Sequence, residues 1–500
     1  MLPIEQVEDR DHLRRVASLL EKENQKLHDK IRALAAENAQ LKGQDLSGAQ
    51  LEMTYLRELL AARERSLFGD SSERRPRDNG DSKTTPKTKV KPRGHGPRVQ
   101  GQLSIVECDH ELAPADRCCT QCGRELTEMS GQSEDSEEIT VIERRFVLVK
   151  HRRKKYRCAC NGQVATAPAP LKLAVSSEAR GRRYSIDFAV EVAVAKYLDH
   201  LPLERQVRMM GRDGLAIDSQ TLWDQIEALA RVLAPAEKAL RQRVLTSPVI
   251  GADETWWRLM AGKTSKDSKR WWAWILTVDD AVSYRILPSR SQEAARSVLG
   301  GYQGHVIADG YGAYQALAKE GSGFVLAHCW AHVRRKYFEA EPHFPDPCRE
   351  ILDLIGRLYG VEREEVTSLE ARAALRHGRS RPIVEQIRAF ALSQRALPQS
   401  SLGKANAYMM GMWSGLVRFL DHPLLPLDNN ATERALRGAV LGRNNHYGSR
   451  SLRGTEVAAL FYSLLETTKL VDVDPKCYLL EAARAALQNQ VALLPHQLVA

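Results

Sequence analysis

The amino-acid sequence lacks any apolar run of about eighteen residues, the length that a membrane-spanning helix requires. Its first residues, MLPIEQVEDRDHLRR, are charged and lack the apolar core of a secretory signal, so secretion is not expected. Cysteine is sparse, and its nine residues are an odd number, which argues against a disulfide framework. We therefore expect a cytoplasmic protein in which clustered cysteines bind metal.

The sequence does contain enough apolar material for several folded domains. At 500 residues the chain exceeds the size of one ordinary hydrophobic core, and its hydrophobic content of 43% excludes a wholly disordered protein. The formal net charge is +10. This basic excess favours a polyanionic partner such as nucleic acid.

Residues 1–66 carry a heptad repeat followed by a second helical stretch. Leucine recurs every seven residues, at Leu13, Leu20, Leu27, Leu34 and Leu41. If these are d positions, Asn24 and Asn38 occupy a positions, where asparagine pairs with its twin in a parallel dimer. We predict a leucine-zipper coiled coil that makes the chain a homodimer or a higher oligomer. A single amphipathic helix packed on its own chain is the alternative.

Residues 67–100 are predicted to be a basic linker. The stretch from Gly69 to Pro97 is rich in Ser, Thr, Pro, Gly, Lys and Arg and has almost no apolar residue. Burial therefore cannot offset the entropy of ordering it. Two interpretations stay open: a solvated tether, or an arm that contacts DNA phosphates.

Cysteines cluster in residues 101–178. The stretch RCCTQCGREL supplies Cys119 and Cys122, and a strand-like stretch that ends in RCAC supplies Cys158 and Cys160. Two cysteine pairs separated by a hairpin are typical of a zinc ribbon, in which four thiolates hold a structural Zn²⁺. The second pair is tighter than usual, and a set of ordinary reduced cysteines is the alternative. Further candidate ligands are Cys108, His110 and Cys118.

Residues 179–246 have helical periodicity. A helix over residues 203–210, a Gly-bearing turn and a third helix capped by Asp218 or Ser219 resemble a helix-turn-helix. The same spacing is common in plain helical bundles. DNA reading and simple packing both stay open for this segment.

From residue 247 the pattern changes to strands. Three short runs of β-branched and aromatic residues are followed by alternating helical and strand-like segments up to residue 340, which predicts a mixed α/β sheet. Residues 341–425 are helical throughout and interrupt the sheet domain, which resumes over 426–472 and precedes a helical tail at 473–500. The tryptophans of the first strands are expected to pack in the core, with base stacking as the alternative.

Three acidic residues stand where distant segments can meet. Asp253 ends the strand VIGAD, Asp309 ends the strand HVIAD, and Glu433 lies in the first turn of a helix opened by Asn429 and Asn430. Each also has a local interpretation, because Asp after a strand is usually a turn residue and Glu433 has the capping-box spacing from Asn430. The residues alone leave a shared carboxylate site and these local roles open.

Four stretches together resemble the DDE transposases of the insertion sequence 66 family. They are VIGADETWW, HVIADGYGAY, LAHCWAHVRRKYFEA and DNNATERALRGAVLGRNNHYGSRSLRGTEVAALFYSLLETTK. The heptad repeat, the motif SLFGDSSERR, the cysteine cluster and the motif YLDHLPLERQ also match the layout of that family. The resemblance covers nearly the whole chain, and its last block is long and specific.

The resemblance implies a multidomain α+β protein: an N-terminal coiled coil, a zinc-ribbon-like domain, a helical DNA-binding domain, and a ribonuclease H-like α/β catalytic domain with an all-helical insertion. It implies that Asp253, Asp309 and Glu433 are catalytic and hold Mg²⁺ or Mn²⁺, hard ions that prefer carboxylate oxygens. Two such ions serve to cleave the element's ends and to join the 3′-hydroxyl to target DNA. Glu466, on the next helix, is the alternative to Glu433.

Basic residues near these acids are predicted to bind DNA phosphates, because guanidinium groups hold phosphate oxygens in a fork. They are Arg334, Arg335, Lys336, Arg434, Arg437, Arg443, Arg450 and Arg453. A solvated basic face is the alternative.

Cys329 and His332 resemble a Cys-x2-His signature of several DDE enzymes. Zinc would need two further ligands, so a structural or DNA-positioning role for His332 is preferred. The resemblance also implies accessory transposition proteins and a place at the nucleoid.

Two rival functions stay open. One is a non-catalytic DNA-binding regulator built on the zipper, the zinc ribbon and the helix-turn-helix. The other is an inactive transposase relic. A regulator has no need of three carboxylates on a sheet beside an arginine-rich loop, so the C-terminal half favours the enzyme.

Overall fold

The computed structural model describes residues 51–61, 146–157, 164–174, 184–260, 269–321 and 323–498. The heptad leucines from Leu13 to Leu41, the linker and the cysteines Cys119, Cys122, Cys158 and Cys160 lie outside these residues, whereas residues 51–61 of the second predicted helical stretch are helical. The short strands β1 (Lys155–Arg157) and β2 (Val164–Thr166) pair antiparallel on either side of the second cysteine pair. None of the described helices is both long enough and apolar enough to cross a membrane.

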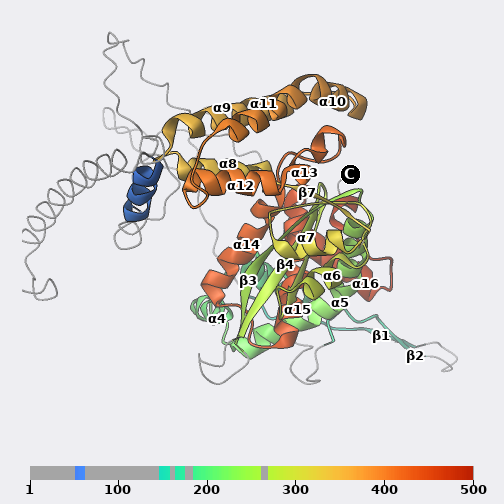
Figure 1. The fold of residues 1–500 in the computed structure, drawn as a ribbon. Helices are drawn as coiled ribbons and strands as arrows, with labels where there is room; N and C mark the ends of the chain where they lie inside the picture. Colours follow the sequence, from blue (N-terminus) through green and yellow to red (C-terminus); the bar gives the residue numbers. More distant parts are fainter. Residues whose placement is uncertain are drawn as a thin grey trace, which may run out of the picture. The chain divides into compact units, whose positions relative to one another are not determined.

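A five-stranded mixed sheet lies at the centre of the described chain, in the order β5-β4-β3-β6-β7 (Figure 1). Its strands are β3 (Val249–Leu259), β4 (Lys269–Val278), β5 (Ala281–Leu287), β6 (His305–Ala308) and β7 (Val325–His328). The first three form an antiparallel meander, and β6 and β7 run parallel to β3. The predicted mixed sheet, with three strands followed by alternating helices and strands, is confirmed.

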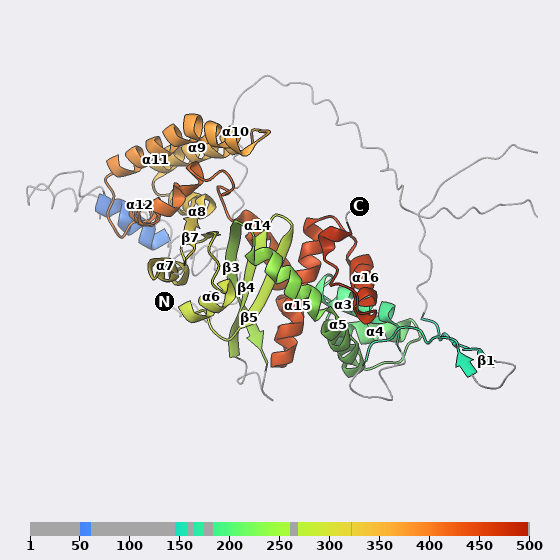
Figure 2. The same ribbon diagram turned by 90° about the vertical axis from the view of Figure 1, so that its right-hand side faces the viewer.

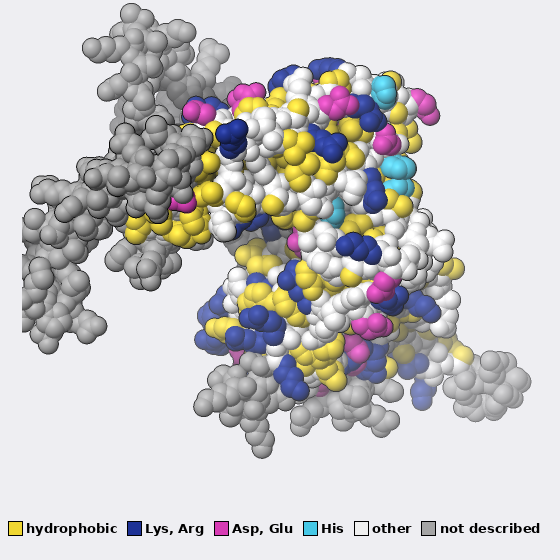
Figure 3. All heavy atoms as spheres, viewed as in Figure 1, with side chains coloured by type: hydrophobic (Ala, Val, Ile, Leu, Met, Phe, Trp, Pro, Cys, Tyr) yellow, Lys and Arg dark blue, Asp and Glu magenta, His cyan; other side chains and the backbone are white. Residues whose placement is uncertain are grey.

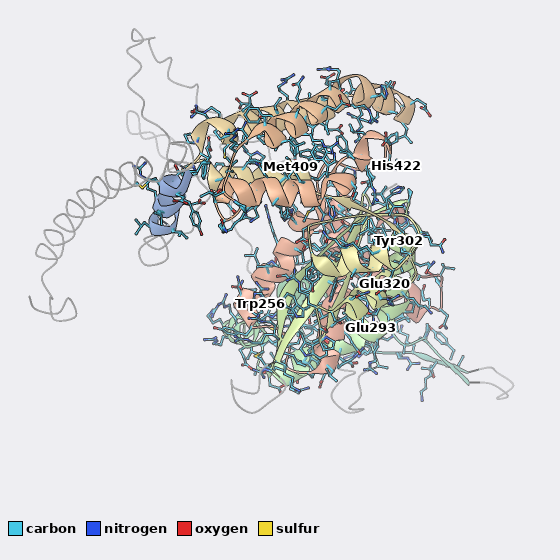
Figure 4. The ribbon with its side chains drawn as sticks, in the orientation of Figure 1. Trp256, Glu293, Tyr302, Glu320, Met409 and His422 are labelled. Carbon is cyan, nitrogen blue, oxygen red and sulfur yellow. The ribbon has the colours of Figure 1, made fainter. Side chains whose placement is uncertain are left out.

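Helices cover both faces of this sheet. Figure 2 shows α15 (Leu452–Leu470) on one side of β3, β4 and β5 and α6 (Gln292–Leu299) on the other. Helix α14 (Asn430–His446) packs on β3 and β4, and α7 (Gly312–Lys319) packs on β7. Trp257 and Trp274 are fully buried between the layers, as expected for core residues. Trp256 instead is partly exposed and lies at the side of the sheet near α14 (Figure 4).

The helical segment before the sheet is present where the periodicity predicts it. Its helices are α3 (Ile186–Tyr197), α4 (Leu203–Arg212) and α5 (Ser219–Leu245). Asp218 caps α5, because its side chain accepts a hydrogen bond from the N–H of Thr221 at 2.6 Å. Buried residues run along α5 from Leu222 to Val244, and the helix packs on α3, α15 and β5. Helix α16 (Pro475–Leu487) packs on α3 and α5.

Residues between β7 and α14 are helical, as predicted. The helices are α8 (Trp330–Ala340), α9 (Pro345–Glu362), α10 (Leu369–Leu375), the π-helical turn η5 (Arg376–Ser380), α11 (Arg381–Ser393), α12 (Ser401–Gly411), α13 (Trp413–Leu416) and the 3-10 turn η6 (Arg418–Leu420). They share a hydrophobic cluster, which includes Trp330, Ile355 and Met409 and also Ile307 of β6 and Ala327 of β7. Met409 lies on α12 (Figure 4). These helices separate β7 from α14 along the chain.

Candidate active site

Two successive acidic residues on β3 lie on opposite faces of the sheet, because side chains alternate along a strand. Asp253 shares its face with Gly251, which approaches the start of α14. Glu254 shares the other face with the side chains of Arg290 and Tyr314. The prediction that Asp253 ends its strand is wrong. Pairing with β6 stops at Gly251, but pairing with β4 continues to Leu259, so Asp253 stands in mid-strand.

Asp309 directly follows β6, the strand that pairs with β3. Its side chain accepts a hydrogen bond from the N–H of Tyr311 at 2.9 Å. Burial, together with the negative charges of Glu254, Asp309 and Glu433, raises the pKa of Asp253 to about 8. A hydrogen bond from the N–H of Glu254, at 2.7 Å, acts in the opposite direction. Asp309 and Glu433 therefore lie close enough to Asp253 for their charges to raise its pKa.

Glu433 does not cap its own helix. The backbone N–H of Asn430 donates to the Asp428 carboxylate at 3.0 Å, which takes the place that a capping box would give to Glu433. The Glu433 side chain is 38% exposed, and one of its oxygens lies 3.7 Å from Nε2 of His332. The local interpretation of Glu433 is thus wrong, and its carboxylate is directed to the neighbourhood of Asp253.

A buried polar network fixes the start of α14 against the sheet. Asn429 donates from its side-chain amide to the backbone oxygen of Ala252 at 2.9 Å, and its Oδ1 accepts from the Thr432 hydroxyl at 2.6 Å. The Thr432 hydroxyl also lies 2.6 Å from that of Thr277 on β4. A Cβ at Gly251 would come within 2.2 Å of Thr432 Oγ1, so only glycine permits this approach. The network sets the position of Glu433, one residue after Thr432.

Sequence reasoning did not single out Glu254. Its side chain is fully buried, forms an ion pair with Arg290 at 2.6 Å and accepts a hydrogen bond from the Tyr314 hydroxyl at 3.1 Å. The Arg290 guanidinium also lies over the ring of Tyr311, 3.8 Å from its centroid. The alternation of side chains along a strand could have indicated its place, because it puts Glu254 on the face of the sheet opposite to Asp253.

The alternative Glu466 is a buried residue of α15 that pairs with Lys469 at 2.8 Å. Burial raises the pKa of its carboxyl, and Lys469 acts in the opposite direction. One of its oxygens would lie 2.2 Å from a Cβ at Gly438, so it packs between α15 and α14. The charge of Glu433 contributes to the raised pKa of Asp253, which favours Glu433 as the third carboxylate.

Comparison with known proteins decides the family. The pattern described as "Transposase IS66 family" matches residues 181–457, more than half of the chain. The chain belongs to this transposase family. A second pattern, the zinc-finger binding domain of transposase IS66, matches residues 116–161, which include all four cysteines predicted as zinc ligands. The match indicates a structural zinc in this transposase.

Curated relatives extend the similarity along the transposase chain. The chain is 30% identical over 476 residues to the uncharacterized protein y4jD of Sinorhizobium fredii (strain NBRC 101917 / NGR234), covering 88% of this chain and 91% of that protein. It is 28% identical over 524 residues to the uncharacterized protein y4qI of the same organism, covering 95% and 94%. Transposase family membership implies that the partner is DNA.

The predicted DNA-binding residues of this transposase differ in their surroundings. Arg334, Arg434 and Arg437 are exposed, and dark blue side chains gather over α14 and α4 in Figure 3. Three others have acidic partners: Arg335 and Lys336 pair with Glu339, and Arg453 pairs with Glu227 and Glu456. DNA binding by these residues stays a prediction.

Arg443 is buried and already engaged. It donates to the Thr255 hydroxyl at 3.1 Å and to the backbone oxygen of Trp256, and its guanidinium lies 3.7 Å from the centroid of the Trp256 ring. Arg443 therefore holds α14 to the second half of β3, after the part that pairs with β6.

Arg450 lines a cavity of about 300 Å³ between α3, α4, α5 and the start of α15. Lys196, Trp223 and His446 line the same cavity. Burial and the charge of Arg450 lower the pKa of Lys196 to about 8. The five arginines near Glu433 in sequence are thus spread over several environments.

Proposed function

We propose that the chain is a DNA transposase of ribonuclease H-like fold, in which Asp253, Asp309 and Glu433 are the catalytic carboxylates. It cleaves the ends of an insertion element and joins the resulting 3′-hydroxyl to target DNA. The observation that carries the proposal is Asp253, a carboxylate in mid-strand whose pKa is raised by burial and by the charges of Glu254, Asp309 and Glu433. Such an arrangement is costly unless a cation binds there, and it is typical of a functional site.

The donor set fits Mg²⁺ or Mn²⁺. Carboxylate oxygens are the ligands that these hard ions prefer, and a divalent cation would offset the burial and the neighbouring negative charges that raise the pKa of Asp253. The chemistry supplied by two bound ions is activation of the attacking oxygen and stabilisation of the leaving oxygen of a phosphodiester. The order of the sheet supports the proposed fold: a three-stranded antiparallel meander is followed, on the β3 side, by two strands parallel to β3.

The fold of the chain positions the three proposed catalytic carboxylates. Strand β3 carries Asp253, Asp309 follows the neighbouring strand β6, and the network of Asn429, Thr432 and Thr277 anchors the start of α14, which carries Glu433. In the first reaction water attacks the phosphorus and the bond to the 3′-oxygen breaks, which leaves a 3′-hydroxyl. In the second that hydroxyl attacks a target phosphodiester, so one P–O bond forms as another breaks and no external energy source is needed.

The remaining parts of the proposal concern DNA and assembly. Cys119, Cys122, Cys158 and Cys160 hold the structural zinc of the finger, and the zipper over residues 1–66 makes the dimer. Exposed arginines of α14 and α8, among them Arg334, Arg434 and Arg437, contact DNA phosphates. No feature of the described residues favours a non-catalytic regulator, since a regulator gains nothing from a repelling carboxylate cluster.

The test is a cleavage assay on DNA that carries the element's own ends. Cleavage and strand transfer should require Mg²⁺ or Mn²⁺ and should fail in Asp253→Asn, Asp309→Asn and Glu433→Gln, while each variant still binds the ends. Asp346→Asn, an exposed aspartate of α9, serves as the matched control. Metal-independent cleavage, or full cleavage by any of the three variants, would show that the proposed site is wrong.

A further inference from the structure

A second cluster of metal-binding side chains lies beside the proposed active site. Cys329 precedes α8, His332 lies in the first turn of α8, and Glu433 lies in the first turn of α14. One ligand atom from each residue lies within 4.8 Å of the other two. The cluster therefore joins two helix starts that are about a hundred residues apart along the chain.

Backbone N–H groups are directed at the Cys329 sulfur. The sulfur is buried and accepts a hydrogen bond from the N–H of Asn429 at 3.2 Å. Burial raises the pKa of this thiol to about 12, whereas hydrogen bonds from the backbone of Asn429, His332 and Ala331 favour the charged form. Several N–H donors directed at one sulfur are of little use to a neutral thiol, which is a weak acceptor.

The imidazole of His332 is incompletely bonded. Its Nδ1 is buried and has no hydrogen-bond partner among the described residues, and its Nε2 lies 3.7 Å from a Glu433 oxygen. That separation is too long for a hydrogen bond. Two atoms that bind one zinc ion at about 2.0–2.2 Å with tetrahedral angles stand roughly 3.4 Å apart, which is close to the separation found here.

We infer that Cys329, His332 and Glu433 form a site for Zn²⁺ or a similar borderline-soft divalent ion, with a fourth position open to water. Thiolate and imidazole select such an ion over Mg²⁺, which prefers oxygen ligands and demands octahedral geometry. Three protein ligands and one open position match zinc sites that exchange their fourth ligand. The preference for a role without metal at His332, stated from the sequence, rested on two missing ligands, and the fold supplies Glu433 as one of them.

This site differs from the proposed Mg²⁺ site in chemistry but shares Glu433 with it. An ion held by Cys329 and His332 competes for the Glu433 carboxylate, and it ties the start of α8 to the start of α14 across the helical segment between them. The inference does not depend on DNA cleavage, because it concerns metal binding by the free protein.

The test is zinc binding by the full chain, prepared free of metal and titrated with Zn²⁺. The wild type should bind about two equivalents, one in the finger and one at this site. Cys329→Ser and His332→Asn should each lose about one equivalent. Cys477→Ser, which removes an exposed cysteine of α16, should keep both. With Co²⁺ in place of zinc, Cys329→Ser should also lose part of the thiolate-to-metal absorption.

Two results would overturn the inference. One is a wild type that binds a single equivalent, with Cys329→Ser unchanged from it. The other is a Cys329→Ser variant that loses one equivalent of zinc while His332→Asn loses none. His332 is partly exposed, so His332→Asn tests the same site with less risk to folding. Circular dichroism of both variants identifies any loss of zinc that follows from unfolding, and the His332→Asn result then decides.

Discussion

Asp253 and Glu254 are neighbours in sequence, and the two faces of the sheet treat them in opposite ways. Both carboxyls have a raised pKa, in each case chiefly because of burial. On the Glu254 face, Arg290 and Tyr314 donate to the carboxylate and lower its pKa again. The charges that act on the Asp253 carboxyl, those of Glu254, Asp309 and Glu433, are all negative and raise its pKa further from the ordinary value.

The difference separates a structural carboxylate from a functional one. A buried charge that has its own cation and hydrogen bonds stabilises a particular packing of the chain, as Glu254 does for β3, Arg290 and α7. A buried charge among like charges destabilises the free protein, and its presence is explained by a ligand that arrives later. The Asp253 face is thus the candidate for cation binding. The contacts on the Glu254 face stabilise the strand that carries Asp253.

The largest effect is expected on the Asp253 face. Asp253→Asn keeps the shape and removes the charge, so DNA cleavage should fall at least about a hundredfold, as when one charge-stabilising group of an active site is lost. Single-turnover cleavage of DNA from the element's ends measures it. The comparison fails if Asp253→Asn cleaves like the Asp346→Asn control.

On the opposite face, the expected effect is on stability. Arg290→Met leaves the fully buried Glu254 without its cation and should lower the free energy of unfolding by about 2–4 kcal/mol. Urea denaturation measures this loss. Arg296→Met is the control, since Arg296 pairs with Glu320 at 2.6 Å between exposed side chains and should lose less than about 1 kcal/mol. Equal losses in the two variants would remove the distinction between the faces.

The support of Glu433 can be tested through Gly251. Gly251→Ala places a methyl group within 2.2 Å of Thr432 Oγ1, so the start of α14 must shift. We expect a loss of about 1–3 kcal/mol in stability, as for overpacked cores, together with reduced cleavage. Gly356→Ala, at a helical glycine of α9 with open space around it, should have neither effect. Cleavage at the wild-type rate in Gly251→Ala would mean that this contact does not position Glu433.

The smallest effect is a pH dependence of the metal-free protein. The pKa of Asp253 is near 8 in the folded state and about 4 when unfolded, so the folded state binds the extra proton between these values and stability falls as pH rises through this range. Without divalent ions at pH 8, Asp253→Asn should therefore be more stable than wild type by about 1–3 kcal/mol. Thermal melts at pH 5 and pH 8 measure this, and a variant less stable than wild type at pH 8 would contradict it.

Much of the fold could be predicted from the sequence because its signals are local. The β-branched and aromatic runs mark β3, β4 and β5, and the segments between β7 and α14 have helical periodicity. Asp309 was found because it directly follows a strand. Part of what could not be predicted depends on tertiary contacts, since the partner of Glu254 is 36 positions away. The hydrogen bond from the N–H of Asn430 to Asp428 is local, but the sequence offers both Asp428 and Glu433 as acceptors for that N–H and does not decide between them. The ion pair of Arg453 with Glu227 likewise depends on the folded chain, whereas that of Lys336 with Glu339 joins residues three positions apart on α8 and is local.

The most direct test of the central claim is anomalous diffraction from crystals of the protein bound to its end DNA and soaked in Mn²⁺, with data collected near the manganese edge. We expect manganese peaks in contact with the carboxylates of Asp253, Asp309 and Glu433, and none beside Glu254, whose charge Arg290 already compensates. Manganese bound elsewhere, with Asp253 and Asp309 free of it, would contradict the account.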